Sequence, residues 1–265
     1  EMQRSLVGSE MCIRDRFLMI YGAMVMQSVI EEKSSRVLEV VVSSVRPFEL
    51  MMGKIFGVAS VAVVQVLIWA VLVCGAGAAV MPHVLPDGAM EAAAALQQGG
   101  GAATAAAGDF DPETLGAIAL ATDVGYLAML FGYLLLFVVG GYLLYSAMFA
   151  AVGSAVDNAQ DAAQLQTPIM IPIILAVIVE MSVLNDPNSP LAFWFSLIPF
   201  TSPVVMMARI PYGIPTWEIV LSLVLLYAAF VGMVWLSAKI YRVGIFMYGK
   251  KPTLREMFRW IRYKY

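Results

Sequence analysis

The sequence predicts an all-α fold, that of a polytopic α-helical membrane protein with five transmembrane helices. Three observations carry this prediction. Of 265 residues, 61% are hydrophobic and only 13% are charged, whereas soluble domains are about 45–50% apolar and about 25% charged. The apolar residues form long continuous runs rather than the roughly ten-residue alternating segments of a membrane β-barrel. The basic residues are concentrated in a few connecting segments.

The apolar runs define the five spans. A helix rises about 1.5 Å per residue, so about 20 apolar residues cross a hydrocarbon core roughly 30 Å thick. Three runs exceed that length, a fourth is shorter and carries Glu180, and the first run has only 14 residues. In chain order the predicted spans are Phe17–Ile30, Ile55–Val80, Tyr126–Val152, Pro168–Leu184 and Ile219–Ile240.

The first span is too short at its N-terminal end. Arg14, Asp15 and Arg16 precede it directly, and each costs roughly 2.5–3.5 kcal/mol at the bilayer centre. The stretch SLVGSEMCIRD at Ser5–Asp15 resembles a translated sequencing-adaptor peptide. We therefore expect residues 1–16 to be a non-native leader before a transmembrane domain at residues 17–265. The alternative is a native basic N-terminus before a short re-entrant helix.

The distribution of basic residues predicts the orientation. The connector Glu31–Lys54 carries four Lys or Arg residues and the tail Lys239–Lys264 carries eight, whereas the long loop Met81–Gly125 has none. Lys and Arg collect on the cytoplasmic side of membrane proteins. Five spans with the connector and the C-terminus inside satisfy this asymmetry, so we expect a multi-pass protein of the inner (plasma) membrane with a cytoplasmic C-terminal tail (residues 241–265).

The loop between the fourth and fifth spans contains a short apolar segment. Leu191–Ile198 (LAFWFSLI) is too short to cross the bilayer and lies between Pro190 and Pro199. This pattern is typical of an interfacial or re-entrant segment, with Trp194 at headgroup depth.

Several kinds of chemistry are excluded by composition. His83 is the only histidine, and Cys12 and Cys74 lie far apart with no surrounding motif, so neither a zinc site nor a catalytic triad is expected. The chain lacks a GxxxxGK[ST] phosphate loop, and its net charge of −3 argues against nucleic-acid binding. No convincing nucleophile–base pair supports an intramembrane enzyme.

The connector after the first span carries the most information. Glu32 precedes Arg36 by four residues, a spacing that supports a helix by a few tenths of a kcal/mol. Pro47 is expected to break this helix, and Phe48–Phe56 to resume it as an interfacial helix turning into the membrane. Without a family comparison, these features identify the connector only as an amphipathic surface segment between two spans.

Three motifs in collinear order carry a family resemblance. The connector pattern EEK-x2-R-x2-E-x3-S-S-x2-P-x-E-L-x3-K-x2-G at Glu31–Gly57 resembles the connector between the second and third spans of ABC-2-type transporter permeases, particularly the sodium-efflux (NatB-like) branch. Asp157–Leu175 is similar to the family's loop and fifth span, and Tyr241–Arg262 to that branch's tail. Against the family pattern, the first span and the extracytoplasmic domain that follows it are missing, so the five spans correspond to family spans two to six.

The resemblance implies a non-enzymatic permease subunit of an exporter, working by alternating access. A separate ABC ATP-binding subunit would carry ATP and Mg²⁺, and a second permease chain, identical or related, would complete the transporter. Sodium efflux is one implied activity. The connector would be a cytoplasmic coupling helix that contacts the ATPase. The implied coupling residues are Glu31, Glu32, Lys33, Arg36, Glu39, Pro47, Glu49 and Lys54.

Two polar residues within spans are candidates for a transport path. Glu180 is the acid well inside a span, and intramembrane carboxylates are functional candidates by default; the alternative is a structural glutamate near the outer end. Gln65 is a second candidate, although an interhelical hydrogen bond would also explain it. The basic segment Lys250–Lys264 resembles an amphipathic anchor to anionic lipid; the alternative is a second contact with the ATPase. As a different class of function, the chain could be a non-transporting scaffold that anchors a cytosolic partner in the membrane.

Overall fold

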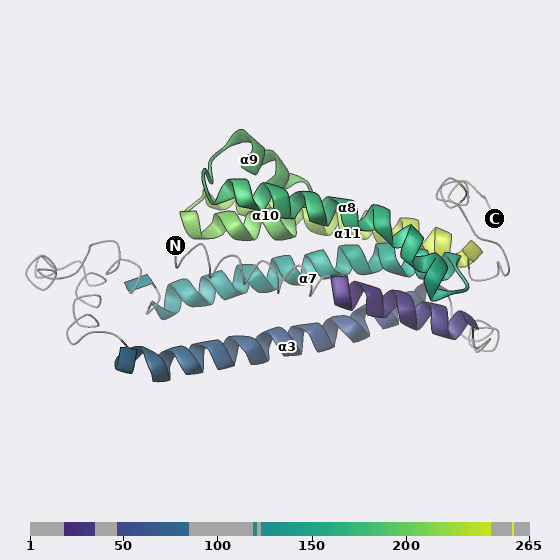
Figure 1. The fold of residues 1–265 in the computed structure, drawn as a ribbon, viewed down its shortest axis with the longest axis horizontal. Coiled ribbons are helices and arrows are strands. Elements are labelled where there is room, and N and C mark those ends of the chain that lie inside the picture. Colours follow the sequence, from purple (N-terminus) through teal and green to yellow (C-terminus); the bar gives the residue numbers. More distant parts are fainter. Residues whose placement is uncertain (1–18, 35–46, 85–118, 121–122, 245–255, 257–265) are drawn as a thin grey trace, which may run out of the picture. The chain divides into compact units, whose positions relative to one another are not determined.

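The computed structural model describes residues 19–34, 47–84, 119–120, 123–244 and 256, and every regular element in these ranges is a helix (Figure 1). The chain divides into two compact units: unit 1 comprises Glu1–Ala62 and Leu136–Tyr265, and unit 2 comprises Val63–Leu135. The elements are, in order, a helix at residues 19–34, α3 (Pro47–Val84), α7 (Val124–Ala155), α8 (Ala159–Val183), α9 (Pro190–Leu197), α10 (Ser202–Arg209), η1 (Ile210–Tyr212) and α11 (Thr216–Gly244).

The all-α polytopic architecture is confirmed. Among the described residues, four helices are long and apolar enough to cross a membrane: Phe48–Gly77, Val124–Ala155, Ala159–Val183 and Thr216–Gly244. The first predicted span corresponds to the helix at residues 19–34, whose 16 residues extend only about 24 Å at the usual helical rise. The count of five spans therefore stays a prediction.

Helix α3 is one uninterrupted helix of 38 residues that begins at Pro47. The segment Phe48–Phe56, expected as an interfacial helix turning into the membrane, is its first part, and the segment before Pro47 lies outside the described residues. A proline is tolerated in the first helical turn because its missing N–H would have no partner there. Pro47 thus starts the helix that continues into the second predicted span.

The other long helices extend beyond their apolar runs. Helix α8 begins at Ala159, nine residues before the predicted span, and contains both Pro168 and Pro172. Helices α7 and α11 likewise start before and end after the runs that predicted them. Apolar length indicates how much of a helix can lie in lipid, whereas the backbone hydrogen bonding of the same helix continues into polar sequence.

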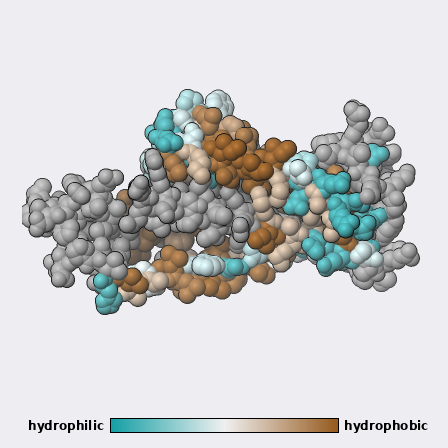
Figure 2. Space-filling view, viewed as in Figure 1, coloured by the Kyte–Doolittle hydropathy of each residue, from teal (hydrophilic) through white to brown (hydrophobic). Residues whose placement is uncertain are grey.

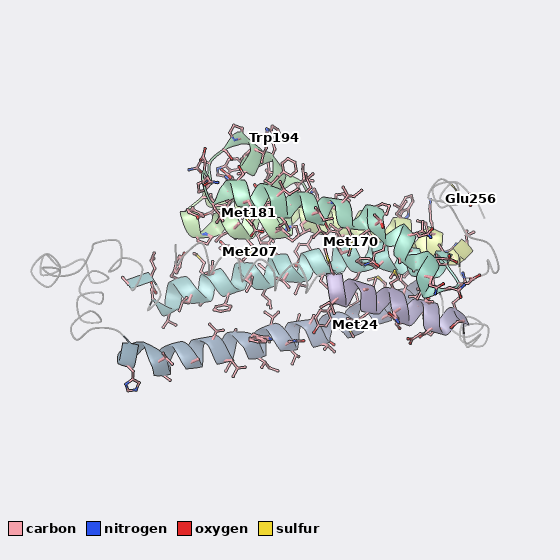
Figure 3. All side chains as sticks on the ribbon, in the orientation of Figure 1. Met24, Met170, Met181, Trp194, Met207 and Glu256 are labelled. Atoms are coloured by element: carbon pink, nitrogen blue, oxygen red, sulfur yellow. The ribbon has the colours of Figure 1, made fainter. Side chains whose placement is uncertain are left out.

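Two short helices, α9 (Pro190–Leu197) and α10 (Ser202–Arg209), follow α8 within unit 1. We call these two helices the cap. Helix α9 begins where Ser189 Oγ accepts a hydrogen bond from the Ala192 backbone N–H at 3.2 Å, with Pro190 in the first turn. It coincides with the short segment predicted at Leu191–Ile198. Trp194 lies on the outer side of α9 (Figure 3) and is 64% exposed. Beneath this outer side, buried apolar residues join α8, α9 and α10: Ala176, Val179, Val183, Ala192, Val204 and Val205.

The core of unit 1 lies between the helix at residues 19–34, α7, α8 and α11. Met26 and Ile30 belong to the same buried cluster as Phe149, Ile173 and Ile240. Hydroxyl groups also bond directly to backbone of neighbouring segments: Ser237 Oγ donates to Ala147 O at 2.6 Å, and Tyr145 Oη to Phe200 O at 2.6 Å. Such bonds hold helices together where lipid offers no hydrophobic driving force.

Candidate functional site: a polar helix junction next to the connector

Most of the predicted coupling residues flank one end of unit 1. There the helix at residues 19–34, α7 and α11 end and α3 and α8 begin (Figure 1). Hydrophilic residues gather at this end, whereas hydrophobic residues cover much of the face over α8 (Figure 2). Within the connector Glu31–Lys54, three of these residues lie in the helix at residues 19–34 (Glu31, Glu32 and Lys33). Three others lie in the first turns of α3 (Pro47, Glu49 and Lys54). Arg36 and Glu39 lie outside the described residues.

The two described helical parts of the connector are tied together. Lys54 Nζ lies 2.6 Å from Glu32 Oε2 and donates a hydrogen bond to Ser28 O at 3.1 Å. Both side chains of the ion pair are partly buried, 12% and 36% exposed. The helix at residues 19–34 and the start of α3 are therefore held next to each other. The side chains of Glu31 and Glu49 are exposed to solvent.

Lys33 points inward. Its side chain is 0% exposed, and its ammonium group makes three contacts: Ser154 O at 2.9 Å, Gly244 O at 2.9 Å and Asp157 Oδ1 at 2.9 Å. We call this cluster of four residues the Lys33 junction. It joins the helix at residues 19–34 to the ends of α7 and α11 and to the short turn before α8.

Backbone electrostatics explain why a buried lysine is stable here. Ser154 lies in the last turn of α7, and Gly244 is the last residue of α11. The last carbonyl groups of a helix have no intrahelical partner and carry the negative end of the helix dipole. The ammonium thus meets two helix C-termini and one carboxylate. Burial lowers the pKa of Lys33 below its ordinary value, while the hydrogen bond and charge of Asp157 oppose that lowering.

The junction depends on close helix approach. A Cβ atom at Gly244 would lie 2.8 Å from Ser154 O, and a Cβ atom at Gly153 would lie 2.8 Å from Met26 O. Real side chains do not tolerate such contacts with backbone. Glycine at these two positions therefore lets the ends of α7, α11 and the first helix come close enough for one lysine side chain to reach them all.

The sequence prediction included Lys33 but not its environment. We expected Lys33 to contact an ATPase, and that contact stays a prediction; in this chain the buried ammonium is directed toward Ser154, Gly244 and Asp157. Asp157 entered the sequence analysis only as the first residue of the motif Asp157–Leu175, and Ser154 and Gly244 did not enter it. Backbone carbonyls have no sequence signature, so only Asp157, 124 positions away in the chain, could have been paired with Lys33 by charge.

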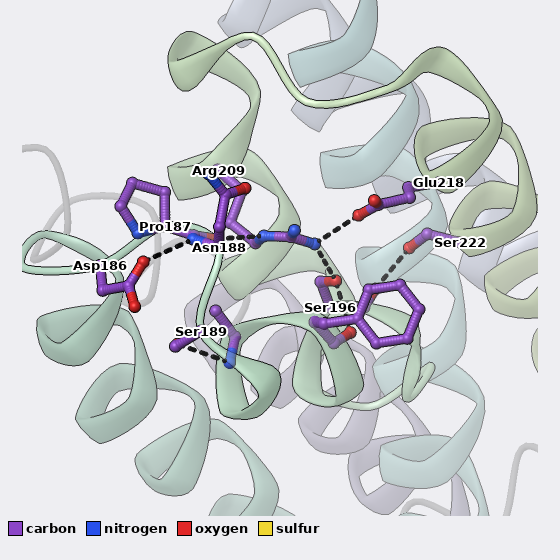
Figure 4. Close-up of polar contacts among 10 residues, drawn as sticks. Asp186, Pro187, Asn188, Ser189, Ser196, Arg209, Glu218 and Ser222 are labelled. Carbon is purple, nitrogen blue, oxygen red and sulfur yellow. Dashed lines mark hydrogen bonds and ion pairs between the residues drawn. The ribbon is translucent and has the colours of Figure 1, made fainter.

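A second buried charge cluster stabilises the cap. Arg209, 2% exposed, pairs through Nη1 with Glu218 Oε2 at 2.9 Å and donates to Ser196 Oγ at 2.7 Å and, through Nε, to Pro187 O at 2.9 Å (Figure 4). Ser222 Oγ donates to Ser196 O at 2.7 Å. One guanidinium thus joins α9, α10, the loop before α9 and the start of α11.

The two candidate transport-path residues lie in different units. Glu180 is 1% exposed in α8 of unit 1, and Gln65 is exposed on the part of α3 that belongs to unit 2. Neither residue is without an interaction partner. Their role in transport stays a prediction. Among the described residues, no group of three or more His, Cys, Asp or Glu side chains could hold a metal ion.

These features define a class, that of a polytopic α-helical membrane protein with a polar helix junction at one end. Comparison with known proteins identifies the family. The family model described as "ABC-2 family transporter protein" matches residues 16–239, and the chain belongs to this family. The family is a membrane component of transporters and is not itself catalytic.

Two curated relatives are similar along most of the chain. One, "Uncharacterized protein YhaP" of Bacillus subtilis, is 26% identical over 241 residues, which are 91% of this chain and 51% of the relative. The other, "Uncharacterized protein MJ1024" of Methanocaldococcus jannaschii, is 27% identical over 240 residues, 90% of this chain and 49% of the relative. The chain therefore spans about half the length of these relatives. No solved structure matches it.

Proposed function

We propose that this chain is the transmembrane part of a permease subunit of an ATP-binding-cassette exporter. A separate ATPase subunit, which would bind ATP and Mg²⁺, drives the exchange between inward-open and outward-open states. The family match over residues 16–239 carries this proposal. A second permease chain completes the transporter. The protein lies in the inner (plasma) membrane, with the connector and the tail in the cytoplasm.

The connector is the proposed docking segment for the ATPase. The Glu32–Lys54 ion pair joins the two described helical parts of the connector, which supports a fixed relative position of its two ends. Glu31 and Glu49 lie exposed, one on each of these parts. Exposed carboxylates at the edge of an interface favour orientation and association rate more than affinity.

Charge reversal tests the docking proposal. In the full-length protein, Glu31→Lys combined with Glu49→Lys should clearly reduce co-purification of the ATPase subunit, because charge reversal replaces attraction by like-charge repulsion. These positions are preferable to Glu32, because reversing Glu32 would also break its pair with Lys54. Asp186→Lys is the matched control, since Asp186 is exposed but lies in the loop predicted outside the cell. Undiminished co-purification of the Glu31/Glu49 variant would refute the docking assignment.

Flux measurement separates an exporter from a scaffold. The resemblance to the sodium-efflux branch makes Na⁺ the first substrate to test. Full-length protein with its ATPase, reconstituted in proteoliposomes, should move ²²Na⁺ only when ATP and Mg²⁺ are present on the ATPase side. A scaffold would retain the ATPase and show no ATP-dependent flux of any substrate. Flux of another compound without Na⁺ flux would keep the exporter and reject the sodium assignment.

A further inference from the structure

The position of Lys33 relates the connector to the helices of unit 1. Lys33 lies in the helix at residues 19–34 and belongs to the connector Glu31–Lys54. A displacement of the connector therefore acts directly on this helix. Because Lys54 binds both Glu32 and Ser28, the start of α3 moves with the same helix.

The Lys33 junction is the polar link from that helix to α7 and α11. Its three partners come from two helix ends and the α7–α8 turn. Separating the buried ammonium from these partners without water would leave an uncompensated charge, which costs several kcal/mol. A joint movement of the first helix with α7 and α11 therefore costs less free energy than a movement that separates the first helix from them.

Steric contact complements the polar link. The backbone of α7 at Gly153 packs on Met26 of the first helix, and Gly244 of α11 packs on Ser154 of α7, each with room only for a hydrogen atom at the glycine. Packed interfaces of this kind transmit displacement because they are not continuously deformable.

We propose that Lys33 is a positioning residue that passes ATP-driven movement of the connector to α7 and α11. This inference rests on the proposed function, since it requires an ATPase on the connector. Lys33 does not touch the ATPase in this proposal; its role is to keep the ends of three helices together while they move. Its removal should uncouple hydrolysis from the conformational change without detaching the ATPase.

The test measures hydrolysis and movement in the same complex. Full-length protein with its ATPase, in a cysteine-free background, carries one spin label at Trp217, which is exposed at 57% on α11. ATP should shift this label between two populations that differ in accessibility to a water-soluble relaxation agent, because α11 moves together with the first helix. In Lys33→Met, we expect ATP hydrolysis near the wild-type rate, and an ATP-driven population shift reduced roughly 2- to 30-fold.

Two further variants distinguish a specific loss of the ATP-driven shift from misfolding or from a general charge effect. Asp157→Asn removes one of the three partners at a side chain that is 27% exposed, so it should fold and show a smaller loss of the shift. Arg242→Met is the matched control, because it removes an exposed positive charge from the same end of α11 and should leave the shift unchanged.

Each outcome has a separate meaning. A full shift in both Lys33→Met and Asp157→Asn would overturn the inference and leave the exporter proposal intact. If the wild-type protein retains no ATPase or shows no ATP-driven shift, the proposed function fails and the role of Lys33 with it. An equal loss in Arg242→Met would show a general charge effect and also overturn the inference.

Discussion

At the scale of residues, the two buried cations of unit 1 are satisfied in different ways. Lys33 uses two backbone carbonyls and one carboxylate, as suits an ammonium with three rotatable donors. Arg209 uses its planar fork to reach Glu218, Ser196 and Pro187 O at once. The chemistry differs because lysine is a compact point charge, whereas arginine presents several donors in fixed directions. Neither cation is interchangeable with the other.

Removal of Arg209 should destabilise the cap. Arg209→Met leaves Glu218, itself only 10% exposed, without its cation, and breaking a buried pair from one side costs about 3–5 kcal/mol. We expect a clearly lower midpoint of thermal unfolding in detergent. The double variant Arg209→Met/Glu218→Gln should recover part of the loss, because no unpaired charge is then buried. Equal midpoints for the single and double variants would contradict this account.

At the scale of elements, helix packing depends on glycines that the sequence showed without indicating their partners. Gly153 and Gly232 both lie inside long helices. A Cβ at Gly153 would meet backbone at 2.8 Å, whereas a Cβ at Gly232 would meet nothing within 4 Å. The same substitution should therefore have opposite effects at the two positions.

The glycine pair gives a matched experiment. Gly153→Ala should lower stability by about 1–3 kcal/mol, the usual cost of overpacking, and weaken the Lys33 junction. Gly232→Ala should be neutral or stabilising by up to about 1 kcal/mol, since alanine is the better helix former. Thermal unfolding of the two purified variants in one detergent measures both. A stabilised Gly153→Ala protein would show that the helices do not approach closely there.

The element scale also shows what could be predicted from sequence. The apolar runs predicted the long helices because burial in lipid needs continuous apolar length. They did not predict that α3 starts at Pro47 or that α8 starts before Pro168, because a helix outside lipid is set by local hydrogen bonding and packing. The connector motif directed attention to Lys33 and Lys54, but Asp157, Glu218 and the carbonyls of Ser154 and Gly244 become partners only through tertiary contact.

At the scale of the whole chain, α11 connects the two charge clusters of unit 1. Glu218 in its first turn binds Arg209, and Gly244 at its last residue binds Lys33. Its 29 residues span about 43 Å at the usual helical rise, more than the hydrocarbon core. If α11 crosses the membrane, its two polar attachments lie on opposite sides.

This arrangement predicts opposite accessibility at the two ends of unit 1. In a cysteine-free background, a cysteine at Asp186 should react with a membrane-impermeant maleimide on intact cells. A cysteine at Glu31 should react only after lysis, because the basic connector and tail predict that this end lies inside. Both positions are exposed, so burial cannot account for a difference, and denatured samples give the maximal labelling of each. Labelling of Glu31→Cys on intact cells would place the connector outside, where no ATPase could bind it, and would contradict both the orientation and the proposed docking.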